Sequence, residues 1–401
     1  MTYNLLIQFL GEHDYDVRKT GNGRWIDQKC APDEISFVAT CVLEYVKSTG
    51  SKTFRSPDVW HHEFSMLMVQ GYFSKPDPAK EQATDEYNKF FRQPLKLFSA
   101  AGILSECKNG IVIDFTIENK AALEYIAESD WNAYLFLRVY IEKTLRDSEL
   151  WDDFASFLDA QDSRYYDKVK TAFREFCFKH TPIRNSSEAG RIFAKVLNPL
   201  ACFYRKRGTV GGRISSAKIL FTDLKYNRLN IRDVGKDKDV TRQEAESGVT
   251  TRESPWTAYK TTKAKGDVNQ FNKEFNGGLT EVVSTGSSGL ATQMHHMFMQ
   301  SICPTISDFR ENIVALTPTQ HMNLAHPNNN TSKIDPEFQR ICLQAKTVIV
   351  RNNILHNYGP SGFYDFGRLM EVLDTGFDVD EFSSILDNDF LAVQEMIDAH
   401  Y

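Results

Sequence analysis

Four of the ten histidines of the chain lie in residues 291–330, which read ATQMHHMFMQSICPTISDFRENIVALTPTQHMNLAHPNNN. Residues 291–298 are predicted to form a short strand that carries His295 and His296. Neighbouring side chains of a strand point to opposite faces, so these two imidazoles are expected to face apart. Residues 312–316, NIVAL, predict a second strand.

A helix is predicted to follow the second strand. Thr317 is a good N-cap, Pro318 suits the first helical position, and Gln320 completes a capping box. His321 then lies in the first turns, and Pro327 ends the helix. The order strand, loop, strand, helix predicts one polar site built from the first strand and the helix.

The chemistry expected of this site follows from its imidazoles. Imidazole is the commonest neutral metal ligand and the side chain best suited to accept a proton near pH 7. One of two adjacent strand histidines can hold an ion while the other takes a proton from water, as metal-assisted phosphodiester hydrolysis needs. The alternatives are surface histidines or a structural zinc site. A closed zinc site usually has four Cys or His ligands, and Cys303 has no second cysteine nearby.

This pattern, HH, then an asparagine, then a histidine nine residues later, resembles the HNH or ββα-metal nucleases, including the nuclease colicins. The longer string HHMF…ENIVALTPTQH…AHPNNNT is similar to a subset of HNH-type type II restriction endonucleases. The motif covers roughly 40 of 401 residues. The resemblance implies that His295 and His321 hold a divalent ion, foremost Mg²⁺, with Mn²⁺ or Zn²⁺ as alternatives. It also implies that His296 is the general base and that Asn312 braces the base and the loop.

One position departs from the resembled pattern. His326 lies five residues after His321, about 140° round an ideal α-helix. It also precedes Pro327, which disfavours helical geometry. His326 is therefore expected either to be a third ligand, if the helix has unwound, or to contact a phosphate. In addition, Met299 and Gln300 stand where related nucleases often have proline and lysine, which leaves fewer charges near the scissile phosphate.

The N-terminal part of the chain predicts three helices and a hairpin. The helices are expected over residues 34–47, from residue 56, and over residues 84–101, and an Asn-Gly turn predicts a hairpin within 103–117. This is the order of a winged helix-turn-helix, whose third helix can enter a DNA major groove. The residues predicted to face DNA are Lys89, Arg92, Gln93 and Lys96. A winged helix that binds protein is the alternative.

The net charge of −6 argues against an indiscriminate polyanion binder, but the charge is unevenly distributed. Residues 199–242 carry a net +7, whereas residues 365–401 carry −9. The basic segment predicts either a DNA contact or a solvated loop, and its Gly-Gly pair predicts a turn that presents Arg213. The residues predicted to contact DNA are Arg205, Lys206, Arg207, Arg213, Arg228 and Arg232.

The predicted fold is α+β and mostly helical, with four regions. These are a winged-helix-like domain (1–120), a helical and basic region (121–250), a nuclease module (251–360) and an acidic helical cap (361–401). No apolar run approaches the ~18 residues of a membrane helix, and the first ten residues lack the pattern of a secretion signal. The seven cysteines are widely spaced, so a reducing cytoplasm is expected.

The expected function is that of a type II restriction endonuclease, which hydrolyses double-stranded DNA at a specific sequence. One module cuts one strand, so a homodimer is expected during cleavage, and a cognate DNA methyltransferase is expected in the same system. Two alternatives remain. The first is a winged-helix regulator whose HNH-like segment only holds a metal, and the second is a nonspecific nuclease or toxin.

Overall fold

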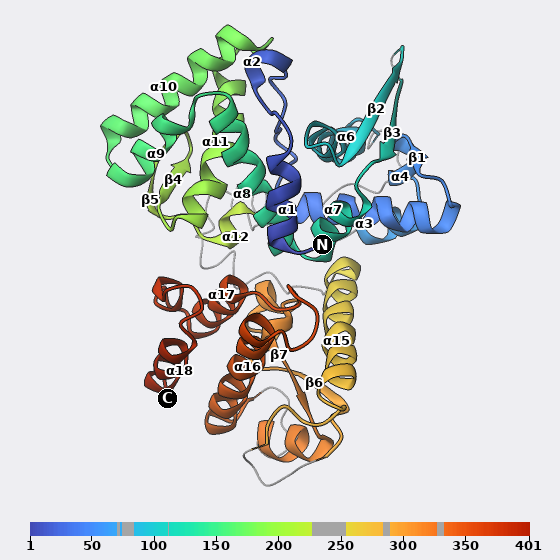
Figure 1. The fold of residues 1–401 in the computed structure, drawn as a ribbon, viewed down its shortest axis with the longest axis vertical. Helices are drawn as coiled ribbons and strands as arrows, with labels where there is room; N and C mark the ends of the chain where they lie inside the picture. The colour runs from blue at the N-terminus through green and yellow to red at the C-terminus, as the bar shows by residue number, and fades with distance from the viewer. Residues whose placement is uncertain (70–72, 74–83, 111, 227–253, 284–288, 327–332) are drawn as a thin grey trace, which may run out of the picture. The chain divides into compact units, whose positions relative to one another are not determined.

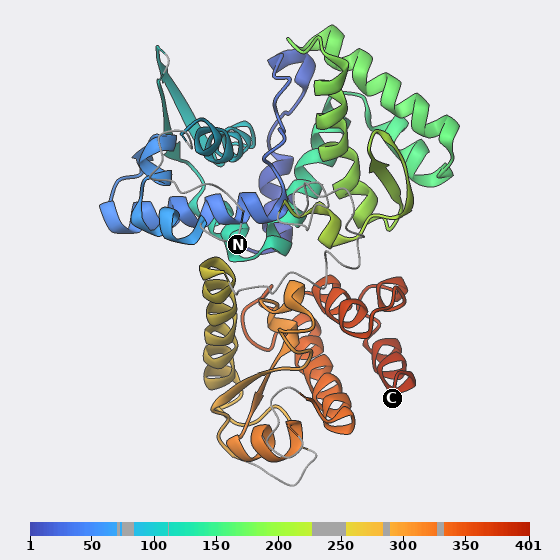
Figure 2. The same cartoon turned by 180° about the vertical axis from the view of Figure 1, so that it is seen from behind.

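The computed structural model describes residues 1–69, 73, 84–110, 112–226, 254–283, 289–326 and 333–401. The chain divides between Pro255 and Trp256 into two compact units, and each is described by itself (Figures 1 and 2). The described residues are mostly helical with small antiparallel sheets, so the predicted α+β, mostly helical class is confirmed. No described helix combines the length and the hydropathy that crossing a bilayer requires.

The first unit contains both of the helical regions that precede the histidine-rich stretch. Its described elements are α1 (Tyr3–Gly11), α2 (Val17–Thr20), α3 (Pro32–Thr49), β1 (Thr53–Phe54), α4 (Ser56–Trp60), α5 (Glu63–Val69), α6 (Thr84–Ala100), β2 (Leu104–Asn109), β3 (Val112–Ile117), α7 (Lys120–Glu128), α8 (Asp130–Asp147), α9 (Trp151–Ala160), α10 (Ser163–His180), α11 (Ser186–Phe203), β4 (Arg207–Val210), β5 (Arg213–Lys218) and α12 (Phe221–Leu224).

The region from α3 to β3 has the predicted order of helices followed by a hairpin. α3 begins at Pro32, which suits the first helical position, and ends at Gly50, whose φ of 73° is left-handed. β2 and β3 form the predicted hairpin, with Gly110 in its turn at a φ of 65°. β1 adds to β3, with Thr53 opposite Thr116, so the strand order is β1-β3-β2.

α6 provides much of the core of this region. Phe90 and Phe91 are fully buried, and both rings lie 6.0 Å from the ring of Phe37 in α3, centroid to centroid. Pro94 lies inside the helix, which nevertheless continues to Ala100. The apolar side of α6 thus faces α3, and this leaves its polar side for the contacts described below.

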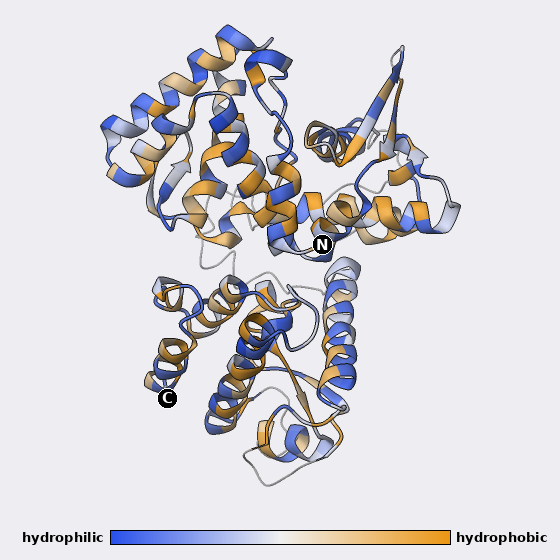
Figure 3. Ribbon diagram, in the orientation of Figure 1, coloured by the Kyte–Doolittle hydropathy of each residue, from blue (hydrophilic) through white to orange (hydrophobic). Residues whose placement is uncertain are grey.

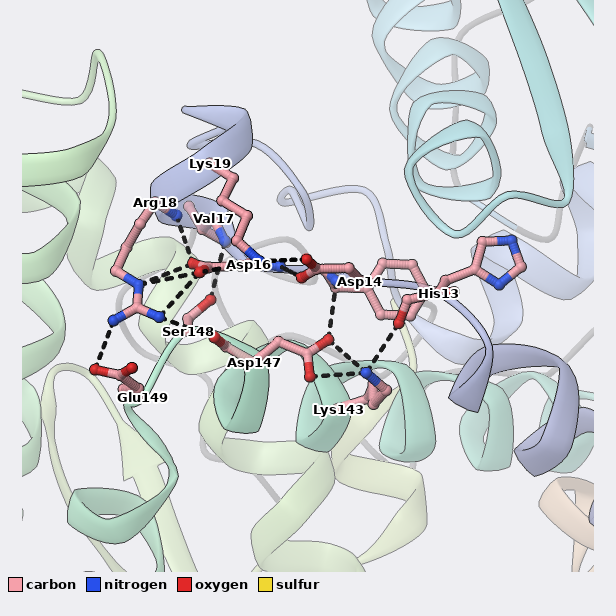
Figure 4. A network of polar contacts seen from close by, with 11 residues as sticks. His13, Asp14, Asp16, Val17, Arg18, Lys19, Lys143, Asp147, Ser148 and Glu149 are labelled. Carbon is pink, nitrogen blue, oxygen red and sulfur yellow. Dashed lines mark hydrogen bonds and ion pairs between the residues drawn. The ribbon is translucent and has the colours of Figure 1, made fainter.

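A set of polar contacts holds the segment after α1 against the end of α8 (Figure 4). Asp147 accepts hydrogen bonds from the backbone N of Tyr15 at 2.9 Å and from Nζ of Lys143 at 2.6 Å. The hydroxyl of Ser148 accepts from the backbone N of Val17 at 3.0 Å. These bonds satisfy backbone donors that burial would otherwise leave unpaired.

The β4–β5 hairpin packs on α11 through a close backbone approach. The side chain of Asn198 bonds both backbone groups of Thr209, accepting from its N at 2.8 Å and donating to its O at 3.0 Å. A Cβ on the neighbouring Gly208 would lie 2.5 Å from Oδ1 of Asn198, so this position needs glycine. The hairpin is therefore fixed to the helix by its strand β4.

The second unit contains the histidine-rich stretch. Its described elements are α15 (Pro255–Phe275), β6 (Gln293–His296), η2 (Pro304–Ile306), η3 (Arg310–Asn312), β7 (Ile313–Leu316), η4 (Gln320–Ala325), α16 (Pro336–His356), α17 (Phe366–Phe377), η6 (Phe382–Ser384) and α18 (Phe390–Ala399).

The β6–β7 hairpin lies between α15 and the C-terminal helices. Ala264 and Val268 of α15 are buried together with Ile313 of β7, and Met294 of β6 packs against them. Figure 3 shows that β7 is hydrophobic, whereas much of α15 is hydrophilic. α15 therefore contributes a narrow apolar face to the hairpin and presents polar residues beside it.

The acidic C-terminal region packs within this second unit, on α16. The ring of Phe377 in α17 lies 5.2 Å from that of Phe298, which follows β6. A Cβ on Gly376 would lie 2.4 Å from the same ring of Phe298, so the small residue permits the contact. The division between units lies close to the predicted boundary at residue 250, which falls outside the described residues. The predicted division into four regions stays a prediction.

Candidate metal centre

The β6–β7 hairpin sets the positions of the first two histidines. The strands are antiparallel, with His295 opposite Val314 and His296 opposite Ile313. The two predicted strands are therefore confirmed, although β6 is shorter than expected. Because the two histidines are adjacent on one strand, their side chains leave it on opposite faces. All four residues of β7 are buried, so the hairpin is anchored in the core.

The predicted capping box is present after β7. The backbone N of Gln320 donates to Oγ1 of Thr317 at 3.1 Å, and Oε1 of Gln320 accepts from the backbone N of Thr317 at 3.0 Å. Gln320 also accepts from the hydroxyl of Thr280 at 2.6 Å and donates to the carbonyl of Val282 at 2.8 Å. A residue expected only to cap the helix thus also fixes it to the segment before β6.

The helix after the capping box has the geometry that brings His326 to the site. η4 is a π-helix, in which hydrogen bonds join residues five apart. His326 follows η4 as its C-cap, with an extended backbone (φ −116°, ψ 95°). The helix has therefore ended at His326, and the α-helical separation of about 140° from His321 does not apply there.

Three imidazoles meet between β6 and η4. The rings of His295, His321 and His326 have centroid distances of 4.8 to 5.2 Å, and one nitrogen from each lies within 4.8 Å of the others. His295 and His326 are buried and His321 is half-buried. Nδ1 of His326 donates to the carbonyl of Lys333 at 2.8 Å, which leaves the lone pair on its Nε2.

Burial lowers the pKa of His295 and of His321 and so favours their neutral form. Desolvation, with smaller contributions from His321 and His326, lowers the pKa of His295 to about 3. Desolvation also lowers the pKa of His321, with a contribution from His326. At pH 7 both rings are therefore neutral, and neutral imidazole is the form that binds a metal ion.

The donor set fits a divalent transition metal ion. Zn²⁺–N bonds of about 2.0–2.1 Å place ligand atoms about 3–3.5 Å apart, so shifts on the order of 1 Å would bring the three nitrogens into range. Imidazole nitrogen suits Zn²⁺ and its neighbours, whereas Mg²⁺ prefers oxygen. Among the described residues of this group, all three ligands are nitrogen atoms. The chemistry therefore favours Zn²⁺ over the Mg²⁺ that the resemblance put first.

His296 is held by the loop that follows β6. Its Nε2 lies 2.8 Å from the carbonyl of Ser307, and its side chain is buried. A carbonyl only accepts, so Nε2 carries the proton and the lone pair lies on Nδ1. His296 thus has the tautomer in which Nδ1 can accept a proton.

Asn312 is fully buried and closes the same loop. Its Oδ1 accepts from the backbone N of Phe298 at 2.8 Å, and its Nδ2 donates to the carbonyls of Phe298 at 3.0 Å and Ile306 at 3.3 Å. These hydrogen bonds join Asn312 to the loop, and the loop in turn holds His296 through Ser307. Asn312 therefore fixes the loop that contacts His296.

Two buried ion pairs support the hairpin, and no sequence pattern predicted either of them. Lys346 of α16 lies 2.7 Å from Glu281, whose carboxylate also accepts from the backbone N of Ala315 at 3.2 Å. Arg368 of α17 lies 2.7 Å from Glu311, beside the start of β7. Each pair joins residues more than 50 positions apart, which no local pattern can indicate.

The polar face of α6 divides into two kinds of residue. Lys89 and Arg92 are exposed. Oε1 of Gln93 accepts from the backbone N of Lys29 at 2.8 Å, and Lys96 forms an ion pair with Glu106 of β2 at 2.5 Å. Two of the four predicted DNA-binding side chains are therefore already bound within the protein.

The predicted DNA-contacting residues of the basic segment (199–242) also differ in exposure. Gly211 and Gly212, with φ of 60° and 77°, form the predicted turn, and Arg213 follows it exposed at the start of β5. Arg205 and Lys206 are half-buried, and the guanidinium of Arg207 donates to the backbone carbonyl of Gln161. The predicted contacts Arg228 and Arg232 lie outside the described residues.

Comparison of the chain with models of protein families, with curated proteins and with solved structures gave no match. The chemistry of the metal centre is therefore inferred from its own residues.

Proposed function

We propose that this chain is a metal-dependent endonuclease that hydrolyses phosphodiester bonds of double-stranded DNA. The observation that supports the proposal is the meeting of three imidazoles from β6 and η4, with His296 on the other face of the same strand. Catalytic zinc sites have three protein ligands and an open position, unlike closed structural sites. A divalent ion bound there would polarise the phosphate and stabilise the leaving oxygen.

Metal binding, proton acceptance and positioning of the base are assigned to residues of the chain. His295, His321 and His326 hold the ion, and the lowered pKa of His295 and of His321 lets these two do so without first losing a proton. His296 accepts a proton from the attacking water at Nδ1, while its Nε2 stays bonded to Ser307. Asn312 keeps the loop in the conformation that orients this ring.

We extend the proposal to a type II restriction endonuclease of the HNH class, on the likeness of residues 291–331 to that subset of nucleases. The winged-helix-like region would hold the duplex through Lys89 and Arg92, and the β4–β5 turn through Arg213. A homodimer would cut both strands, and a cognate methyltransferase would protect the host DNA. The preferred ion is Zn²⁺ or Mn²⁺, with Mg²⁺ supporting less activity.

The test is digestion of a plasmid of known sequence with Zn²⁺, Mn²⁺ or Mg²⁺, followed by mapping of the ends. We expect discrete fragments with fixed ends, and we expect His321→Ala to lose both metal binding and cleavage. A smear of fragments would indicate a nonspecific nuclease instead. DNA binding without nicking under every ion would contradict the enzyme and favour a regulator with a metal-held scaffold.

A further inference from the structure

The consecutive helices α10 and α11 of the first unit pack side by side and form a groove between them (Figures 1 and 2). The volume of this groove is about 460 Å³. The buried rings of Phe173 and Phe193, whose centroids are 5.6 Å apart, give it an apolar base. Its other lining residues are mostly polar or charged, namely Asp167, Lys170, Thr171, Arg174, Ser186 and Ser187.

Two cations of α10 lie along this groove. Lys170 and Arg174 are four residues apart, so their side chains leave the helix on the same face. Among the residues that the structure describes, Arg174 forms no hydrogen bond or ion pair, and its side chain is exposed. Asp167 lies seven residues before Arg174, about 10 Å away along the helix axis. The guanidinium therefore brings to the groove a positive charge that no described carboxylate pairs with.

Hydroxyl side chains accompany these cations. α11 begins with Ser186 and Ser187, which line the groove together with Thr171 of α10. The backbone N–H groups of Ser187 and Glu188 already donate to the side chain of Asn185, at 2.8 and 3.4 Å. A ligand would therefore be recognised by side chains and not by the end of the helix. Cations with hydroxyl donors are the side chains that contact phosphates of nucleic acids.

Gly190 keeps space open in the groove. A Cβ on this residue would meet no atom within 4 Å, so packing within the first unit does not require glycine here. Glycine inside a helix costs roughly 1 kcal/mol relative to alanine. Without a side chain at this position, a ligand can approach the backbone of α11 closely.

The groove lies next to the turn between β4 and β5. Nζ of Lys170 donates to the carbonyl of Gly212 at 2.5 Å, and the exposed Arg213 follows this glycine. An ammonium group has three donors, so the bond leaves Lys170 charged and able to donate to a second acceptor. Lys170 thus joins the groove to the residue through which the β4–β5 turn is proposed to contact DNA.

We propose that the groove between α10 and α11 binds successive phosphates of the DNA backbone, with Arg174 and Lys170 as its cations. The hydroxyl groups of Thr171, Ser186 and Ser187 are further donors. The inference rests on the proposed function for the choice of DNA as the ligand, and it adds a contact surface that takes no part in cleavage.

The test is titration of a DNA duplex of arbitrary sequence at several salt concentrations, without added divalent ion. Arg174→Gln and Lys170→Gln should each make the plot of log binding constant against log salt concentration less steep, by about 0.9 in slope, because one phosphate contact is lost. Arg174→Lys keeps the charge and should keep the wild-type slope. Lys179→Gln is the matched control, since Lys179 is exposed on α10 about 140° round the helix from Arg174. Its slope should equal that of the wild type.

Gly190→Leu tests the space in the groove without a change of charge. The leucine side chain would occupy the groove and displace the phosphates, so the slope should fall by up to about 1.8. Urea unfolding should show no loss of stability, because leucine favours a helix more than glycine does.

The outcomes separate this inference from the nuclease proposal. Wild-type slopes for Arg174→Gln and Gly190→Leu would overturn the inference even if the protein cuts DNA, and so would absence of duplex binding. Inorganic phosphate that displaced the duplex at constant ionic strength would indicate a closed site for free phosphate and contradict it. Reduced slopes in a protein that cuts no DNA under any ion would support the groove and overturn only the nuclease function.

Discussion

The imidazole centre of the second unit and the polar face of α6 in the first unit were both predicted as binding sites from the order of elements along the chain, yet their contacts differ. In the centre, three buried or half-buried imidazoles face one another. On α6, Lys96 pairs with Glu106 and Gln93 accepts from the backbone of Lys29. The first arrangement leaves nitrogen lone pairs gathered at one point, whereas the second uses its polar groups to join elements of the fold.

The difference has a physical cause. Neutral imidazoles contribute little favourable interaction energy to one another. Burying a group of them is therefore favourable mainly when a bound ligand contacts their nitrogen atoms. A lysine or an amide, by contrast, can be satisfied by a nearby carboxylate or backbone group. A cluster of neutral ligands is therefore a stronger indication of a functional site than a row of polar residues on a helix.

The largest effect is expected from His296→Ala, which tests whether the centre is catalytic. Cleavage should fall on the order of 10²-fold or more because the general base is lost, while metal and DNA affinity stay unchanged. Single-turnover kinetics and Zn²⁺ titration would measure both. His356→Ala, exposed at the end of α16, is the matched control. Cleavage by His296→Ala at the wild-type rate would remove the assigned base.

The support of the centre is tested by Asn312→Ala. The variant loses three buried hydrogen bonds to Phe298 and Ile306, so its free energy of unfolding should fall by about 3 kcal/mol. Urea unfolding would measure the change. Asn323→Ala, at an exposed position of η4, should change it by less than about 0.5 kcal/mol. Equal stability of the two variants would show that the loop does not depend on Asn312.

The neutral state of the centre predicts how the metal-free protein responds to acid. The folded-state pKa of His295, about 3, lies below its unfolded value of about 6.5, so the unfolded chain binds more protons between these values. Stability should therefore fall as the pH drops below 6.5, by about 2 kcal/mol at pH 5 from His295 alone. Urea unfolding in a chelator would measure the decrease, and His295→Gln should lessen it. A pH-independent stability would contradict the burial of a neutral ring.

The smallest effects are expected on the α6 side of the comparison. If this face contacts DNA, Lys89→Ala and Arg92→Ala should each make the plot of log binding constant against log salt concentration less steep, by about 0.9 in slope. Lys96→Ala should leave it unchanged because its ammonium group already pairs with Glu106. Titrations of a DNA duplex at several salt concentrations would measure these slopes. If Lys96→Ala reduced the slope as much as Lys89→Ala does, the ion pair between Lys96 and Glu106 would have to open when DNA binds.

The sequence alone determined the elements whose interactions are local. The β6–β7 hairpin, the capping box of Thr317 and Gln320, the β2–β3 hairpin and the Gly-Gly turn before Arg213 were all predicted and are present. Each depends on strand alternation, a helix-capping group or a turn residue within a few positions. The proposed ligands His295 and His321 followed from the same local order, together with a family resemblance.

The tertiary structure decided what depends on distant residues or on an uncommon helix. His326 joins the group of His295 and His321 because η4 is a π-helix that ends before it and its own backbone is extended, whereas α-helical spacing would have separated it from His321. Lys96 of α6 pairs with Glu106 of β2, which local spacing does not indicate. Such contacts join groups that only packing brings together, because the free energy of burial and pairing is set by neighbours in space and not by spacing along the chain.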